Sequence, residues 1–98
     1  MPAIMIALNT INRENPEALA AYADGAMPLI KAAGGKLAGR YVYEETIVGG
    51  GFPDVVFTVE FPSAQIIKDL FNSEAYQALI PHRNKAFTSF NVCICNAP

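Results

Sequence analysis

The chain has 98 residues, of which 52% are hydrophobic and only 16% are charged, and its formal net charge is −2. This acidic balance excludes the basic surface that nucleic-acid binding requires, and no apolar run is long enough to span a membrane. One domain over residues 1–98 is expected at this length. Because the apolar share is high for so small a chain, we also expect an oligomer interface to cover the surplus.

Residues 3–10 (AIMIALNT) form an almost continuous apolar run. Such a run is typical of a central strand that is covered on both faces. The residues at this end of the chain show no basic leader and no small-residue cleavage pattern. We therefore expect a cytoplasmic protein with no secretory signal.

A helix is predicted to begin at Asn15 and Pro16, with Asn15 accepting hydrogen bonds from the first free amides. Pro28 is expected to kink or split this helix, and the pair Gly34–Gly35 to end it. Apolar residues at helical spacing define one buried face, namely Leu19, Tyr22, Ala23, Ala26, Ile30 and Ala33.

Two strands are predicted next, over residues 36–45 (KLAGRYVYEE) and 55–61 (VVFTVEF). The connection between them, 48–54 (VGGGFPD), resembles a phosphate loop only superficially, because it lacks the Gly-Lys-Ser/Thr ending and leads into a strand. A hairpin loop is the better interpretation. Strict alternation in the first of these strands puts Leu37, Gly39, Tyr41 and Tyr43 on one face and Ala38, Arg40, Val42 and Glu44 on the other.

Ser63 is predicted to cap a second helix, whose buried side carries Ile66, Ile67, Leu70 and Phe71. Asn72 and Ser73 are expected to interrupt and recap it, and a further helical piece is expected from Glu74 to about Ile80, with Pro81 as the break.

A last strand is predicted over 88–95 (TSFNVCIC), with Phe90, Val92 and Ile94 on one face. Its two cysteines, Cys93 and Cys95, share the other face, at a spacing at or past the limit for a disulfide, and are interpreted as small buried hydrophobes. With a single histidine in the chain, neither a metal nor another cofactor is expected.

The predicted order is β-α-β-β-α-β. Right-handed crossovers then give an α+β, ferredoxin-like fold, a four-stranded antiparallel sheet with two helices on one face. The opposite face carries apolar residues and is left bare. A second copy of the same sheet is the simplest cover, so a homodimer is expected, with its two sheets packed face to face or closed into a barrel.

Three stretches carry a family resemblance: EFPS (60–63), NSEAYQALIPHR (72–83) and AGGKLAGR (33–40). They resemble the family known as domain of unknown function 1330, which belongs to the dimeric α+β barrel superfamily. The resemblance implies that fold, with a cleft between the sheet and the helices of one subunit. The superfamily includes cofactor-free monooxygenases of quinol-like substrates, lactone isomerases, haem-handling enzymes and ligand-binding modules, so fold alone does not choose a function.

Six polar side chains are candidates for such a cleft. His82 and Tyr76 are the catalytic candidates, and Tyr22, Arg40, Glu60 and Arg83 are the ligand-binding candidates. Each has a structural interpretation as well. The tyrosines suit a core, Arg40 and Glu60 suit an ion pair, Arg83 suits a helix C-terminus, and His82 suits an exposed helix end. His82 is also the one imidazole available to a haem.

Two functions remain open from the sequence. One is a pocket for a small aromatic or carboxylated metabolite, with Arg40 holding an anionic group and His82 or a tyrosine moving a proton, as in a cofactor-free oxygenase or isomerase. The other is a non-catalytic dimeric ligand-binding or regulatory module. RNA binding shares the same element order, but the chain is acidic and no Lys/Arg-Gly motif precedes its aromatic strand.

Overall fold

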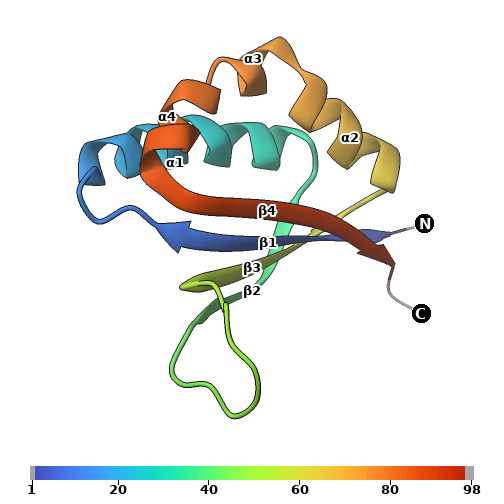
Figure 1. Cartoon of the computed structure of the whole chain (residues 1–98). Coiled ribbons are helices and arrows are strands. Elements are labelled where there is room, and N and C mark those ends of the chain that lie inside the picture. The colour runs from blue at the N-terminus through green and yellow to red at the C-terminus, as the bar shows by residue number, and fades with distance from the viewer. Residues whose placement is uncertain (1, 97–98) are drawn as a thin grey trace.

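The computed structural model, which describes residues 2–96, is a four-stranded antiparallel sheet in the order β2-β3-β1-β4. Figure 1 shows all the helices on one side of this sheet. The strands are β1 (Ala3–Ile11), β2 (Lys36–Val42), β3 (Val55–Phe61) and β4 (Phe87–Asn96), and the helices are α1 (Pro16–Ala32), α2 (Ala64–Asn72), α3 (Glu74–Gln77) and α4 (Ile80–Ala86). The predicted α+β, ferredoxin-like fold is confirmed. No helix within residues 2–96 is long and apolar enough to cross a bilayer.

The central strand β1 has one fully buried face. Ala3, Met5, Ala7 and Asn9 are each no more than 5% exposed, and they point toward the helices. At one end of the sheet, this face packs against Phe61 of β3 and the buried side of α2 to form the hydrophobic core. The buried side predicted for α2 is confirmed, with Ile67 and Leu70 inside.

Helix α1 differs from the prediction at its start and middle. Asn15 makes no side-chain capping bond, whereas the side chain of Asn12 accepts a hydrogen bond from the Glu14 amide. Pro28 does not split the helix, which runs unbroken from Pro16 to Ala32. A proline in a helix interior costs about 3 kcal/mol. We attribute its tolerance to the apolar face of α1, which packs over the sheet on both sides of Pro28.

The predicted end of α1 at two glycines is confirmed. The Gly35 amide donates to the Ile30 carbonyl and the Gly34 amide to that of Lys31, which is a Schellman motif. Gly34 has a φ of 85°, a conformation that favours glycine. Gly35 has no room for a side chain, because an added Cβ would lie 2.9 Å from the Ile30 carbonyl oxygen and 2.9 Å from the Phe61 ring.

Serine caps set the positions of the next two helices, as predicted for Ser63 and Ser73. The Ile66 amide donates to the Ser63 hydroxyl oxygen, and the Tyr76 amide donates to that of Ser73. Asn72 makes no cap; it is the last residue of α2. Pro81 is not a break but lies in the first turn of α4, where a missing amide hydrogen costs little.

A bulge in β2 changes which side chains face the helices. Leu37 pairs with Val59, whereas Gly39 pairs with Thr58 and Arg40 with Phe57, so one residue of β2 has no partner. Because an extra residue reverses the alternation beyond it, Leu37 and Arg40 lie on the same face of the sheet. The prediction that placed them on opposite faces is therefore wrong.

The outer face of the sheet carries no helix within residues 2–96, and several of its residues are apolar. It presents Ile4, Ile6 and Leu8 of β1 and Val56 of β3, all half-buried. Cys93 and Cys95 lie on this face, exposed and not joined by a disulfide, with a weak hydrogen bond between their sulfur atoms over 3.9 Å. The prediction that they are buried is wrong for the single chain, since no element within residues 2–96 covers this face.

The connection between β2 and β3 extends away from the helices, below the sheet in Figure 1. Two of its apolar residues, Ile47 and Val48, are 93% and 81% exposed, and Phe52 stacks on Tyr43 with ring centroids 6.3 Å apart. The predicted hairpin connection is confirmed, but the strand before it is shorter than predicted, because β2 ends at Val42 and not at residue 45.

We predict that Gly35→Ala lowers the free energy of unfolding by about 1–3 kcal/mol, because the added methyl group meets a carbonyl oxygen and a buried ring that have little freedom to move. Urea unfolding would measure the change. Gly50→Ala is the matched control, since nothing lies within 4 Å of its added Cβ. An equal effect of both substitutions would contradict the prediction.

Candidate functional site

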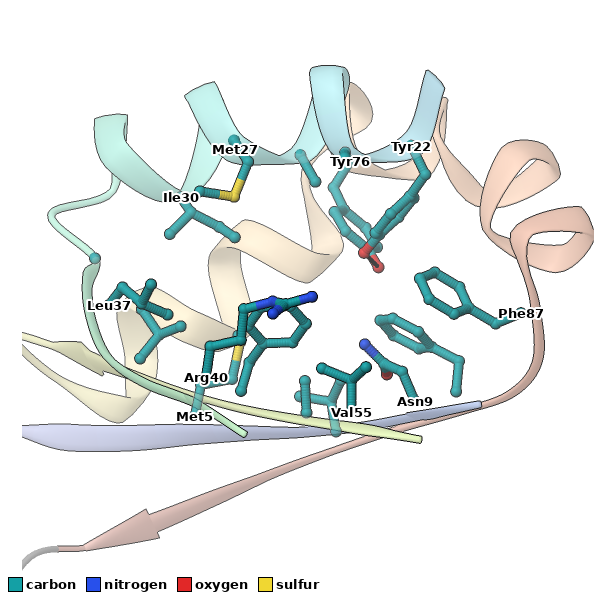
Figure 2. A pocket seen from close by; sticks show the side chains of 18 of the residues that line it. Met5, Asn9, Tyr22, Met27, Ile30, Leu37, Arg40, Val55, Tyr76 and Phe87 are labelled. Carbon is teal, nitrogen blue, oxygen red and sulfur yellow. Dashed lines mark hydrogen bonds between the residues drawn. The ribbon is translucent and has the colours of Figure 1, made fainter. Parts of the chain in front are cut away.

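A cavity of about 390 Å³ lies between the sheet and α1. Its floor is formed by β1 and β3, its roof by α1, and its sides by the edge strand β2 and by α3 and β4 (Figure 2). Small side chains leave this space open, because Ala7 of β1 and Ala26 of α1 both line it and are both buried. The predicted apolar face of α1 thus covers a cavity as well as a core.

One end of the cavity is an aromatic cluster. Tyr22 of α1 makes edge-to-face contacts with Tyr76, Phe87 and Phe90, with ring centroids 6.2, 5.6 and 5.8 Å away. Phe71 packs against Tyr76 at 4.5 Å. These rings join α1, α2, α3 and β4 into one aromatic wall of the cavity.

A hydrogen-bonded chain runs through this wall. The Tyr22 and Tyr76 hydroxyls are 2.8 Å apart, and Arg83 of α4 donates from Nη1 to the Tyr76 hydroxyl oxygen over 3.1 Å. Arg83 also lies over the Phe90 ring, 5.0 Å from its centroid. Tyr76 and Arg83, two of the predicted site residues, are therefore in direct contact although they lie in separate helices, α3 and α4.

The hydrogen-bonded side chains have one hydroxyl hydrogen to spare for a ligand. Arg83 has no acceptor, so it is the donor to Tyr76. The two tyrosines have two hydroxyl hydrogens, and only one is used in the bond between them. Whichever tyrosine donates to the other, one hydrogen remains for a third partner. Figure 2 shows both hydroxyls directed from the roof toward the cavity.

Tyr22 is suited to donate a hydrogen bond rather than to accept a proton as a base. Burial raises the pKa of its hydroxyl above the ordinary value, the hydrogen bond with Tyr76 raises it further, and the nearby Arg83 cation lowers it. The hydroxyl therefore stays protonated at neutral pH.

Asn9 of β1 is a site residue that sequence reasoning missed. It is 4% exposed, and its side-chain oxygen Oδ1 has no hydrogen-bond partner within residues 2–96. A buried polar group without a partner costs about 1–3 kcal/mol. The available signal was the asparagine itself, which is uncommon within a buried strand and here ends an apolar run.

Arg40 of β2 extends over the floor of the cavity. Its guanidinium lies over the Phe57 ring, 5.6 Å from the centroid, and Figure 2 shows it pointing inward. The residue is exposed at the edge of the sheet, so its charge remains partly hydrated. The charged residues that line the cavity, among those the structure describes, are two cations, Lys31 and Arg40.

Two of the predicted site residues lie elsewhere. Glu60 pairs across the sheet with Ile4 and Lys36, between the buried residues Val59 and Phe61, so it projects from the outer face and not toward Arg40. His82 is exposed on α4 and does not line the cavity. The structure brings together Tyr22, Tyr76, Arg83 and Arg40, and leaves out Glu60 and His82.

The arrangement is therefore an apolar, aromatic cavity with a few separate polar groups. One hydroxyl hydrogen and one guanidinium are available to a bound molecule. Within residues 2–96, no group of three or more His, Cys, Asp and Glu side chains is placed to hold a metal ion.

We predict that the free energy of unfolding falls above about pH 10 and that Tyr22→Phe reduces this fall. Unfolded tyrosine ionises near pH 10, whereas the raised pKa keeps folded Tyr22 neutral, so unfolding at higher pH releases a proton. One such group contributes a slope of up to about 1.4 kcal/mol per pH unit, present at neutral pH as stability and lost as the pH rises.

Urea unfolding at several alkaline pH values measures this slope. Tyr43→Phe is the control, because the Tyr43 hydroxyl is exposed and bonds only to nearby Thr46. An unchanged slope in Tyr22→Phe would contradict the assignment.

Comparison with known proteins places the chain among uncharacterised relatives. No curated protein matches it. The crystal structure of a protein of unknown function from Rhodopseudomonas palustris is 22% identical, with 99% of this chain and 82% of that chain covered and a TM-score of 0.85. A structure from Mycobacterium tuberculosis is 19% identical, covering 100% and 95%, with a TM-score of 0.66. A NIPSNAP-like domain protein from Burkholderia xenovorans is 11% identical, covering 99% and 85%, with a TM-score of 0.65.

These structures are similar in fold, and at such identities the likeness extends no further. The family model described as a domain of unknown function matches residues 2–97, nearly the whole chain. The chain therefore belongs to the DUF1330 family.

Proposed function

We propose that this protein binds a small aromatic carboxylate in the cavity between its sheet and α1, as a ligand-binding module. The observation that carries the proposal is the charge pattern of the cavity. Its walls are aliphatic and aromatic, and its charged lining residues, among those described, are the cations Lys31 and Arg40. An apolar body with one negative group complements such a lining.

The volume supports a ligand of modest size. Small-molecule pockets span about 300–1,000 Å³, and this cavity of about 390 Å³ lies at the lower end of that range. The Phe57 ring on the floor and the aromatic cluster at one end offer faces and edges for a planar ring. One or two fused rings therefore fit the space better than a long chain or a nucleotide.

Two donors are available for the negative group. The Arg40 guanidinium suits a carboxylate because it donates two parallel hydrogen bonds. The spare hydroxyl hydrogen of the Tyr22–Tyr76 pair offers a further bond to an oxygen acceptor, and the Arg83 cation behind Tyr76 polarises that donor. A carboxylate or carbonyl oxygen of the ligand would accept hydrogen bonds from these two donors.

The positions of the polar side chains agree better with binding alone than with the reaction of a cofactor-free oxygenase or isomerase. Either reaction requires a group that takes a proton from the substrate. His82 is exposed outside the cavity, and the raised pKa of Tyr22 makes its tyrosinate form unfavourable. No His, Asp, Glu or Cys occurs among the described residues that line the cavity.

We also propose that two copies pair through the outer faces of their sheets. The face bearing the apolar residues Ile4, Ile6, Leu8 and Val56 carries no helix within residues 2–96, and each of these side chains is only partly buried in the single chain. A second copy offers the same pattern, so the surfaces are self-complementary. The exposed cysteines of β4 would be covered in such a dimer.

We predict that 2-naphthoate binds the wild-type protein and that Ala26→Leu weakens this binding at least tenfold, because the larger side chain occupies the cavity. Titration of the probe's fluorescence measures the affinity. Ala7→Val should weaken binding for the same reason, because Ala7 lines the floor of the cavity. Ala20→Leu is the control, since Ala20 is exposed on α1 and does not line the cavity.

The same titration tests whether the Arg40 charge contributes to the binding of the carboxylate. Arg40→Gln should weaken 2-naphthoate about tenfold but leave the neutral analogue 2-naphthamide nearly unaffected, since only the carboxylate gains from the guanidinium. Probe binding that is insensitive to Ala26→Leu and Ala7→Val would place the ligand elsewhere and refute the proposed site.

For the dimer, we predict a solution mass near twice the 10.6 kDa of one chain and a monomer in Thr58→Lys. Thr58 is the cross-strand partner of Ile6 on the outer face, so the substitution would bring two lysines into the apolar interface. Light scattering after size exclusion measures the mass, with Ala20→Lys on α1 as the control. A monomeric wild-type protein would rule out this packing.

A further inference from the structure

We infer that Cys93 and Cys95 form a two-sulfur binding site for trivalent arsenicals on the outer face of the sheet. Both side chains are exposed, and their sulfur atoms lie 3.9 Å apart. Neither residue lines the cavity, which is on the opposite face of the sheet. The site is therefore separate from the proposed binding function, and either of the two can fail without the other.

The backbone places the two sulfur atoms side by side. Both residues belong to β4, in which residues two apart point to the same face of the sheet. Cys93 lies opposite Ile6 of β1 and Cys95 opposite Ile4, in a part of the ladder without a register shift. β4 is an edge strand, so no other strand within residues 2–96 lies beyond it. The strand thus holds the pair in position and leaves it open to an incoming molecule.

The distance between the sulfur atoms suits one bridging atom better than a disulfide. A disulfide bond is about 2.05 Å long, and cysteines two apart on a strand lie at or past the Cα separation that it tolerates. By contrast, an atom bonded to both sulfurs at about 2.3 Å, a usual metal–thiolate length, spans 3.9 Å at a bond angle of about 115°. The pair therefore accepts a thiophilic centre in the conformation that the structure shows.

The number of available ligands narrows the class of that centre. Zinc takes four ligands, and within residues 2–96 no third His, Cys, Asp or Glu side chain joins the two cysteines. A trivalent arsenical needs only two sulfurs, because it carries its third substituent as a covalent group. An apolar substituent would lie against the half-buried side chains of Ile4 and Ile6. An organic arsenical therefore matches the site better than a hydrated metal ion.

The binding step is a condensation, which we write for the probe phenylarsine oxide. The two S–H bonds break and their hydrogens leave with the arsenic-bound oxygen as one molecule of water. Two arsenic–sulfur bonds form, one to Cys93 and one to Cys95. Arsenic stays trivalent and both sulfurs keep their oxidation state, so the step consumes no oxidant and no reductant.

The protonation of the pair favours this condensation over the reactions of a thiolate. Partial desolvation raises the pKa of the Cys93 thiol, and its hydrogen bond and charge interaction with Cys95 raise that pKa further. The thiolate is the nucleophile in alkylation and in disulfide exchange, so a thiol with a raised pKa reacts slowly in both. A redox-active cysteine pair requires the opposite shift, and binding is the role that the pair supports.

The test uses intact protein that has been reduced with a phosphine and then freed of the reductant. Mass spectrometry after titration with phenylarsine oxide should show one phenylarsine group per chain, with the loss of both free thiols. The adduct should survive an excess of a monothiol and be removed by ethanedithiol. Cys93→Ser and Cys95→Ser should each bind the probe at least about a hundredfold more weakly, because the second bond no longer forms within the same molecule.

A matched control keeps two thiols in β4 but separates them. The double variant Cys95→Ser with Ser89→Cys has its second cysteine four residues from Cys93, at another exposed position of the same strand. It should bind the probe as weakly as the single variants. Tight binding by this double variant or by either single variant would overturn the site, because adjacency of the two sulfurs would then be irrelevant.

The proposed pairing of two copies is tested separately. If neither the wild-type protein nor Thr58→Lys forms the adduct, the site is refuted and the binding function of the cavity is untouched. If Thr58→Lys forms it and the wild-type protein does not, the two-sulfur site is supported and the second copy covers it. Failure of 2-naphthoate to bind has no bearing on either result, since that probe addresses the opposite face of the sheet.

Discussion

The packing of Tyr22 against the aromatic side chains at one end of the sheet is the constraint on which the site depends. Its ring touches Phe87 and Phe90 of β4, and its hydroxyl bonds that of Tyr76 in α3. Rings of this size do not compress, so they set the distance between α1 and the sheet at this end. Farther along, the small residues Ala7 and Ala26 are too short to fill that distance, and the cavity is the space they leave.

The polar groups of the cavity share one property, which is that the protein itself does not satisfy them completely. One hydroxyl hydrogen of the tyrosine pair and the inward-pointing Arg40 have capacity left for a bound molecule, and the buried side-chain oxygen of Asn9 has no partner within residues 2–96. Folding alone gives no reason to retain such groups, because apolar residues would pack there more stably. Unsatisfied polarity inside an otherwise apolar space is what a binding site requires and a core avoids.

Most of the fold follows from local pattern. β3 begins and ends where its run of β-branched and aromatic residues predicts, and Ser63, Ser73 and Gly34 mark helix ends as expected. The two prolines were harder to interpret. Pro28 lies inside an unbroken α1, because the gain from packing the helix exceeds the local cost of the residue. Pro81 lies in the first turn of α4, where a missing amide hydrogen costs little.

The sequence by itself determined the element order, hence the sheet order, and the spacing of seven residues that lets Arg83 reach Tyr76. These depend on short-range periodicity, which each segment carries alone. Only the tertiary structure decided the rest. The bulge in β2 turned Arg40 and Leu37 to one face, register turned Glu60 away, and the apolar neighbours across the sheet left Asn9 without a partner. Whether a side chain is satisfied depends on residues distant in the chain, and that information exists only once the strands are paired.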